Sequence, residues 1–204
     1  MPAAEGQRAA LGFRVKSGWA TAVLLSDPAG DPRLIERYRA ELSDPDDPHS
    51  RQPYHAAMGV AQTDEVVLAR LIEVVHGCAR RSVVAHLERH RAGGYRLVGA
   101  GIVVGSDAPP ETMANPHIRA HASEGRLFRT ALERGLEEGG VDVSIFVERA
   151  LYATAATLLG TSEESVKRAV TTVGKGRVPG WRTDQKAATV AAWLVLRGKP
   201  GGGT

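Results

Sequence analysis

Three ionisable side chains share one face of a predicted helix, and their chemistry suits a metal ion or a phosphate. His117, His121 and Glu124 lie at positions i, i+4 and i+7 of the segment 116–138, which is predicted to be helical. At about 100° per residue they fall on the side of its apolar stripe, so we expect them to face the protein interior. Two imidazoles and a carboxylate are ligands that suit one divalent metal ion, such as Zn²⁺, Fe²⁺ or Mn²⁺.

The same pattern has two other interpretations. A structural hydrogen-bond network would also satisfy inward-facing polar groups, each of which costs about 1–3 kcal/mol when it is buried without a partner. A phosphate or nucleotide site would use the imidazoles as hydrogen-bond donors. The residue pattern leaves all three alternatives open.

A further carboxylate, Asp184, begins the predicted helix 183–197 on the face that carries its small apolar residues. We include it with His117, His121 and Glu124 as a candidate catalytic residue. The alternative is a charge in the first helical turn that stabilises the helix by about 0.3–1 kcal/mol.

A second group of polar side chains suits an anion. The loop 44–63 has no hydrophobic period, and within five residues it gathers a guanidinium, an amide, a phenol and an imidazole. A predicted hairpin turn adds an arginine, a lysine and a serine, and guanidinium groups bind phosphate oxygens in pairs. The candidate anion-binding residues are Arg14, Lys16, Ser17, Arg51, Gln52, Tyr54 and His55.

The hydrophobic pattern predicts the elements that position these residues. Apolar runs at 9–15 and 19–26 surround a turn at Gly18 and predict a hairpin, and the alternating segment 33–42 predicts a third antiparallel strand. Further strands are expected at 95–104, which is nearly all apolar, and at 141–147. The predicted helices are 64–90, which Thr63 caps, 116–138, 148–159, 162–173 and 183–197.

Composition indicates an ordinary globular protein. Apolar residues make up 43% of the 204 and charged residues 24%, which argues against disorder, and we expect one domain over 1–198 with a disordered tail at 199–204. The net charge of +3 permits contact with nucleic acid but does not indicate it. Cys78 is the only cysteine, and the sequence has no signal-peptide or membrane-spanning pattern, so a cytoplasmic protein with no membrane partner is expected.

The order of the predicted elements resembles the ribonuclease-H-like fold, an α/β class with three antiparallel strands, then βαβ crossovers, and flanking helices. Residues 11–20, LGFRVKSGWA, resemble the Gly-Ile-Asp-Pro-Gly motif and following Gly-aromatic pair of RuvC-type Holliday-junction resolvases. Residues 165–170, SVKRAV, and then 174–177 and Asp184 are similar to the C-terminal motifs of those enzymes. The chain is also similar to a bacterial protein group from which no activity follows.

The resemblance implies cleavage of nucleic acid by two divalent metals held by a carboxylate cluster, but this sequence departs from that pattern. Arg14 stands at the position of the first-strand aspartate, and a guanidinium cannot ligate a cation. The segment 95–104 contains no acidic residue, and only Asp184 matches a carboxylate of the family. The sequence therefore predicts that the standard two-metal site is absent.

Three functions follow from these observations, and the sequence does not decide whether the protein is an enzyme. The first is a divergent phosphoester hydrolase that acts on nucleic acid or a nucleotide through a rebuilt polar site, with one divalent metal as its candidate cofactor. The alternative is a non-catalytic module of the same fold that binds nucleic acid or another anion, and a third is a domain that binds only other proteins. The inward row of His117, His121 and Glu124 favours the first function over the third, and Arg14 favours the second over a standard nuclease.

Overall fold

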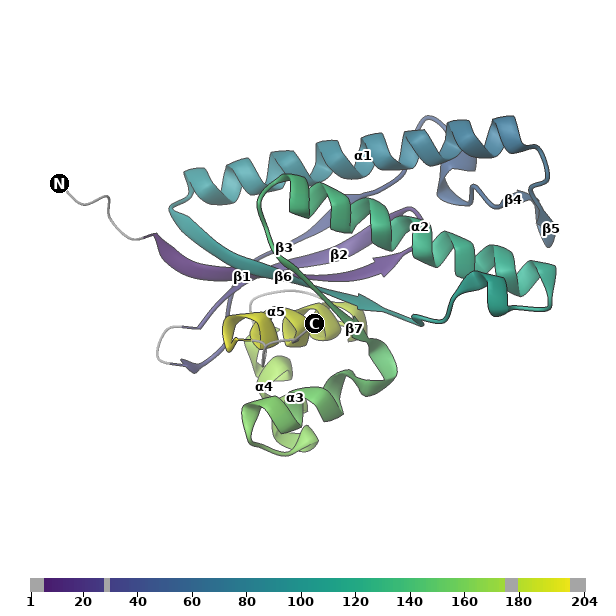
Figure 1. Ribbon diagram of the computed structural model, residues 1–204. Coiled ribbons are helices and arrows are strands. Elements are labelled where there is room, and N and C mark those ends of the chain that lie inside the picture. Colours follow the sequence, from purple (N-terminus) through teal and green to yellow (C-terminus); the bar gives the residue numbers. More distant parts are fainter. Residues whose placement is uncertain (1–5, 28–29, 175–179, 199–204) are drawn as a thin grey trace.

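A mixed β-sheet lies at the centre of the molecule, with helices on both faces (Figure 1). The computed structural model describes residues 6–27, 30–174 and 180–198. The predicted tail at 199–204 and most of the segment 174–177 lie outside the described residues.

The sheet has five strands in the order β3-β2-β1-β6-β7. β1 pairs antiparallel with β2 and β2 with β3, whereas β1 pairs parallel with β6 and β6 with β7. This is the predicted arrangement of an antiparallel meander followed by parallel crossovers. The strands are β1 (Gln7–Lys16), β2 (Trp19–Ser26), β3 (Arg33–Glu41), β6 (Tyr95–Val104) and β7 (Val143–Val147).

Two helical layers enclose the sheet. Figure 1 shows α1 (Glu65–Ala92) and α2 (Pro116–Glu138) on one face. The other face carries α3, α4 and α5, and we call it the α5 face. The bounds of these helices are Leu151–Leu159, Glu163–Gly174 and Thr183–Leu196.

Alternation along β1 divides the core between these layers. Leu11 and Phe13 are buried with α1 and α2, while Gly12 and Arg14 point to the α5 face. The glycine is needed there, because a Cβ at Gly12 would lie 1.9 Å from the carbonyl oxygen of Ala188 in α5. The apolar strands predicted at 9–15 and 95–104 are thus covered on both sides.

Two predictions about the segment 44–63 need correction. It is not a loop throughout, since it contains a 3₁₀ turn, Pro48–Arg51, and a small hairpin of β4 (His55–Ala57) and β5 (Val60–Ala61). The N-cap of α1 is Asp64 rather than Thr63, because the Asp64 carboxylate accepts hydrogen bonds from the N–H groups of Val66 and Val67.

Among the described residues, the structure has no helix of the length and apolarity needed to span a bilayer.

Candidate metal centre

Three histidines from two distant segments meet beside the β4–β5 hairpin. His117 and His121 come from the first two turns of α2, and His55 begins β4. One ring nitrogen from each can be chosen so that all three lie within 4.8 Å of one another. The Nε2 atoms of His117 and His121 are only 3.2 Å apart. We call His55, His117 and His121 the histidine cluster.

The carboxylate of Glu124 lies close to two members of this cluster. Its Oε1 lies 2.7 Å from Nδ1 of His55, in a contact where both side chains are almost completely buried. Its Oε2 lies 3.8 Å from Nδ1 of His121. Burial raises the pKa of Glu124 above its ordinary value, against the lowering effect of His55. The carboxylate therefore fixes the ring orientation of His55 and directs the opposite nitrogen away from itself.

That opposite nitrogen, Nε2 of His55, is buried and has no hydrogen-bond partner among the described residues. The side chain of His55 is 6% exposed, so water does not replace the missing partner freely. A buried ring nitrogen without a partner costs about 1–3 kcal/mol, which a bound ligand would recover. The residue that carries this orphaned nitrogen belongs to the same cluster as His117 and His121.

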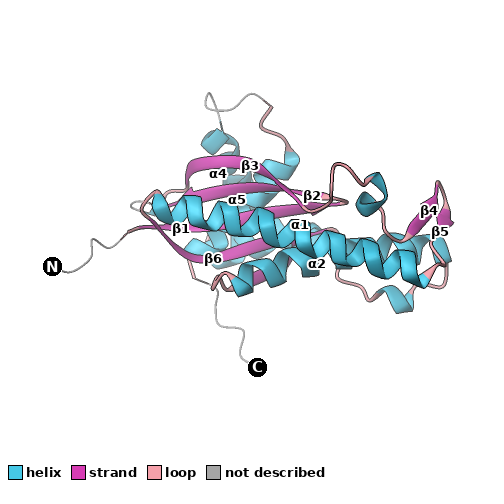
Figure 2. Cartoon of the chain, turned by 90° about the horizontal axis from the view of Figure 1, so that it is seen from above, coloured by secondary structure: helices cyan, strands magenta, loops and turns pink. Residues whose placement is uncertain are grey.

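The exposure of the cluster differs from the prediction. Glu124 faces the interior as expected, but His117 and His121 are exposed. The reason is that α1 and α2 extend past the ends of the sheet strands, so the first turns of α2 have no sheet beneath them (Figure 2). The hairpin β4–β5 covers this extension instead, and it leaves one side of the cluster open to solvent.

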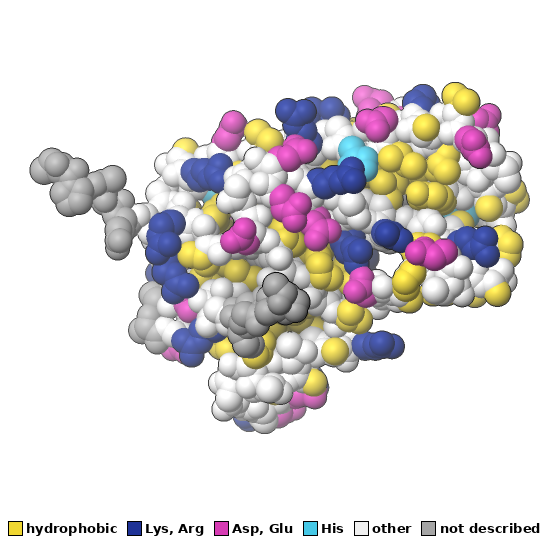
Figure 3. All heavy atoms as spheres, viewed as in Figure 1, with side chains coloured by type: hydrophobic (Ala, Val, Ile, Leu, Met, Phe, Trp, Pro, Cys, Tyr) yellow, Lys and Arg dark blue, Asp and Glu magenta, His cyan; other side chains and the backbone are white. Residues whose placement is uncertain are grey.

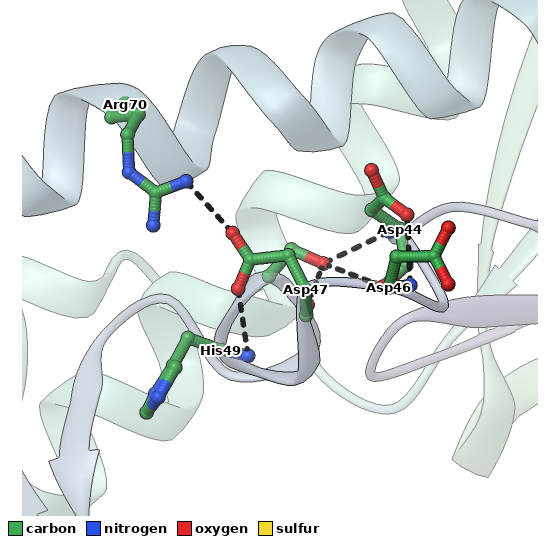
Figure 4. Close-up of polar contacts among 6 residues, drawn as sticks. Asp44, Asp46, Asp47, His49 and Arg70 are labelled. Carbon is green, nitrogen blue, oxygen red and sulfur yellow. Dashed lines mark hydrogen bonds and ion pairs between the residues drawn. The ribbon is translucent and has the colours of Figure 1, made fainter.

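The loop before His55 is fastened to α1 through Asp47 (Figure 4). Nη1 of Arg70 donates to Oδ2 of Asp47 at 2.8 Å, and the backbone N–H of His49 donates to Oδ1 at 3.2 Å. The hydrogen bond from Arg70 holds the pKa of Asp47 below its ordinary value. The loop is therefore held against α1 at Asp47, which precedes His55 in the sequence.

The histidine cluster could hold a transition-metal ion, and Glu124 contacts one of the three imidazoles from the protein interior. A tetrahedral Zn²⁺ ion has Zn–N bonds of about 2.0–2.1 Å, which places ligand nitrogens about 3.3 Å apart. The 3.2 Å pair of His117 and His121 already fits this spacing, and both imidazoles are exposed enough to turn toward His55. A metal-bound histidine usually gives its other ring N–H to a carboxylate, which is the role that Glu124 has toward His55.

The structure groups these residues differently from the predicted set of His117, His121 and Glu124, whose role as ligands stays a prediction. His117 and His121 lie together as expected, but the third imidazole is His55, which the sequence had placed with the anion-binding residues. Glu124 lies behind His55 instead of beside the two histidines of α2. The dense polar run 51–55 was the available signal, and its pairing with α2 was not visible in the sequence.

The other predicted site residues do not join this cluster. Asp184 is bound by Lys16, whose Nζ lies 3.1 Å from Oδ1 of the carboxylate. Arg14 points to the α5 face and forms a paired contact with Glu148, with distances of 2.6 and 3.2 Å. Both cations are thus partnered with carboxylates of the protein.

The predicted anion-binding residues make several different contacts. Arg51 packs against the hairpin turn that carries Ser17, since a Cβ at Gly18 would lie 2.7 Å from its Cγ. Ser17 and Gln52 are exposed, while Tyr54 is half-buried, and burial raises its pKa. Arg14 and His55 are paired with Glu148 and Glu124, and an anion site formed by this group stays a prediction.

Two solved structures of RuvC from Thermus thermophilus are similar to this chain. One shows the protein in complex with a Holliday junction substrate, with a TM-score of 0.56, 13% identity, and coverage of 91% of this chain and 90% of that chain. The other has a TM-score of 0.54 and 12% identity, and covers 91% of each chain. No protein-family model matches the sequence, and no curated protein matches it either.

Proposed function

We propose that this chain, which has the ribonuclease-H-like fold that its element order predicted, is a phosphoester hydrolase acting on nucleic acid or a nucleotide. Its reaction centre would lie at the histidine cluster, with one divalent metal ion held by His55, His117 and His121. A bound metal ion would supply a water nucleophile of lowered pKa and would polarise a phosphoryl oxygen.

One observation carries this proposal. His55 has a buried Nε2 without a hydrogen-bond partner among the described residues, and His55 forms one group with His117 and His121, whose Nε2 atoms are adjacent. A purely structural network would be expected to satisfy that nitrogen. The open solvent side, beside His117 and His121, would admit a phosphoester to the ion.

Each protein group has a distinct part in this proposal. His55, His117 and His121 are the ligands. Glu124 is a positioning residue, because it acts on the centre through the ring of His55. Asp184 is left out, since Lys16 neutralises it on the other face of the sheet.

The substrate class has support from the fold and from local charge. Proteins of similar structure include one bound to a Holliday junction. A hollow of about 170 Å³ beside the middle of α2 is lined by Arg126 and Arg129. These arginines form ion pairs with Glu111 and Asp107, which an incoming phosphate would compete for.

Metal binding is the first test. Calorimetric titration of the metal-free protein with Zn²⁺ and with Mn²⁺ should give one ion per chain. His55→Ala and His121→Ala should abolish this binding, and Glu124→Gln should weaken it by about 10–100-fold, the usual cost of losing a supporting carboxylate. Asp184→Asn is the matched control and should bind as the unmodified protein does. Equal binding by all variants would contradict the proposed centre.

Hydrolysis is the second test, with a generic phosphodiester and with labelled oligonucleotides as substrates. Activity should require the ion and should disappear in His121→Ala while melting temperatures stay close to the unmodified value. Cleavage supported by Mg²⁺ that is lost in Asp184→Asn but kept in His121→Ala would overturn the proposal. Metal binding without cleavage of any of these substrates would contradict the proposed hydrolase and would leave a structural metal site in a non-catalytic module.

A further inference from the structure

A second hollow, separate from the histidine cluster, lies on the α5 face of the sheet. It has a volume of about 700 Å³ and is formed by β2, β3 and the start of α5. Helix α5 packs on β1, β2 and β6. Because α5 packs on these strands rather than on β3, the side chains of β3 that point to the α5 face form one wall of the hollow. The residues that matter for the argument are Trp19, Arg37, Arg39, Arg182 and Gln185, together with Asp184, the acidic residue of this lining, whose carboxylate is paired with Lys16 at 3.1 Å.

The strand register explains why an aromatic ring and two arginines share this wall. Thr21 of β2 stands opposite Arg39 of β3, and Val23 stands opposite Arg37. Residues two apart on a strand point to the same face, so Trp19 joins Thr21 and Val23 on the α5 face. Val23 is buried under the helices there, which identifies the face.

The wall combines a stacking surface with positive charge. The guanidinium carbon of Arg39 lies 4.6 Å from the centre of the Trp19 ring, so Arg39 covers one face of the ring, and a base would stack on the other face or displace this guanidinium. Arg39 is paired with Glu41 at 2.5 Å. Arg37 and Arg182, by contrast, have no carboxylate within ion-pair distance in the part of the chain that the structure describes.

We propose that this hollow binds single-stranded nucleic acid, with a base stacked on Trp19 and phosphates held by Arg37 and Arg182. Aromatic rings beside a cationic groove are the means by which proteins hold unpaired bases without reading their sequence. A duplex keeps its base faces stacked internally and cannot offer one to Trp19. Oε1 of Gln185 accepts the backbone N–H of Arg182 at 3.0 Å, which leaves the NH₂ group of this amide to donate to a base edge or a sugar hydroxyl.

This inference rests on the nucleic-acid substrate class proposed above, but not on the reaction. The histidine cluster belongs to the layer of α1 and α2, whereas the hollow belongs to the α5 face. Binding can therefore be measured without metal and without cleavage. If single-strand binding is not observed, the proposal of a metal centre still stands. If metal binding is not observed, the proposal of single-strand binding still stands.

The experiment is fluorescence anisotropy with 15-nucleotide DNA and RNA probes of one sequence, single-stranded or in duplex, in EDTA. Trp19→Ala should weaken single-strand binding by roughly tenfold, the loss of one stacked base. Arg37→Gln and Arg182→Gln should each lower the slope of log affinity against log salt by about 0.7, which corresponds to one phosphate contact on a single strand. Comparison of the two probes shows whether the 2′-hydroxyl contributes.

Arg33→Gln is the charge-matched control, because Arg33 lies at the start of β3 and does not line this hollow. It should change neither the affinity nor the salt slope, and all variants should keep the unmodified melting temperature. The proposal is overturned if Trp19→Ala binds like the unmodified protein. Tighter binding of duplex than of single strand, with equal effects of Arg33→Gln and Arg37→Gln, would also overturn it and would indicate diffuse duplex binding.

Discussion

At the scale of single residues, side-chain chemistry was easier to predict than partnership. The spacing of His117, His121 and Glu124 correctly put them on one side of a helix, because helical periodicity is local. The proximity of His55 to these residues was not predicted, because it depends on a contact with Glu124, which lies 69 positions away in the sequence. The sequence contains no periodic signal for such a contact, only the polar density of its loop.

Another histidine, His86, makes a residue-scale prediction about pH. Its ring stacks on Tyr38 with 3.7 Å between centroids, and its Nδ1 lies 3.1 Å from Nη2 of Arg89. Burial, and then the charge of Arg89, lower the pKa of His86 from its ordinary 6.5 to about 4. The unfolded chain therefore binds more protons than the folded protein between those two pH values. This contribution to stability is complete above pH 6.5 and is lost as the pH falls toward 4.

Replacement of His86 by glutamine should consequently reduce the loss of melting temperature between about pH 7 and pH 5. Burial also lowers the pKa of His90, which acts in the same direction, and raises that of Glu124, which acts in the opposite direction. Both groups are present in the variant, so the difference between the two proteins reports His86 together with its charge interaction with His90. The melting temperatures of both proteins can be measured by circular dichroism at several pH values between about 7 and 5. Parallel curves for the variant and the unmodified protein would contradict the assignment.

At the scale of elements, the strands and helices could be predicted because each carries its own period or its own apolar run. The exceptions lie where the chain leaves the sheet. The strands β4 and β5 are too short to show alternation, and their hairpin is stabilised by α2 rather than by its own sequence. The exposure of His117 and His121 has a similar cause, because an amphipathic pattern does not reveal where the surface beneath a helix ends.

The contact of α5 with the sheet gives the element-scale prediction. A Cβ at Gly12 would lie 1.9 Å from the oxygen of Ala188 and 3.0 Å from the Cβ of Ala192. Gly12→Ala should lower the free energy of unfolding by about 3 kcal/mol, the upper range for overpacking, because α5 must move away from β1. Gly125→Ala is the control, since nothing lies within 4 Å of a Cβ at that position in α2. It should stabilise the helix by up to about 1 kcal/mol.

Urea denaturation followed by tryptophan fluorescence would measure both changes, with the slope of the transition as a check on two-state unfolding. A loss below about 1 kcal/mol in Gly12→Ala would mean that α5 does not approach β1 as closely as described. Trp193 belongs to α5 and Trp181 packs against the same hydrophobic cluster, so both report on the position of the helix.

At the scale of the whole molecule, charge is balanced rather than concentrated. The net charge is only +3, and Figure 3 shows basic and acidic side chains interspersed over the face in view. Long-range attraction of nucleic acid should therefore be weak, so binding must depend on local arrangements. The balance extends to the carboxyl ends of the parallel strands, where ligands of open α/β sheets commonly bind. There the protein pairs Arg14 with Glu148 and Lys16 with Asp184.

These two ion pairs motivate the prediction that the unmodified protein binds no Mg²⁺ at this end of the sheet. At about 4 Å and an effective dielectric near 20, a guanidinium repels a divalent ion by roughly 8 kcal/mol. The side chain of Arg14 is only 9% exposed and is fixed on Glu148, so it cannot easily turn away. Its replacement by aspartate should remove the repulsion and leave two carboxylates near each other.

Arg14→Asp should therefore be less stable by about 1–3 kcal/mol without metal, below the usual cost of breaking a buried pair because Glu148 is 38% exposed. Added Mg²⁺ should raise the melting temperature of this variant, since the ion binds the folded state, and should leave the unmodified protein unchanged. Arg149→Asp, at an exposed arginine next in the chain to Glu148, is the charge-matched control and should show no response to Mg²⁺. If Mg²⁺ stabilised the unmodified protein, and Asp184→Asn removed that effect, the carboxyl end of the sheet would hold a metal despite Arg14. The reaction centre would then have to be sought there instead of at the histidines.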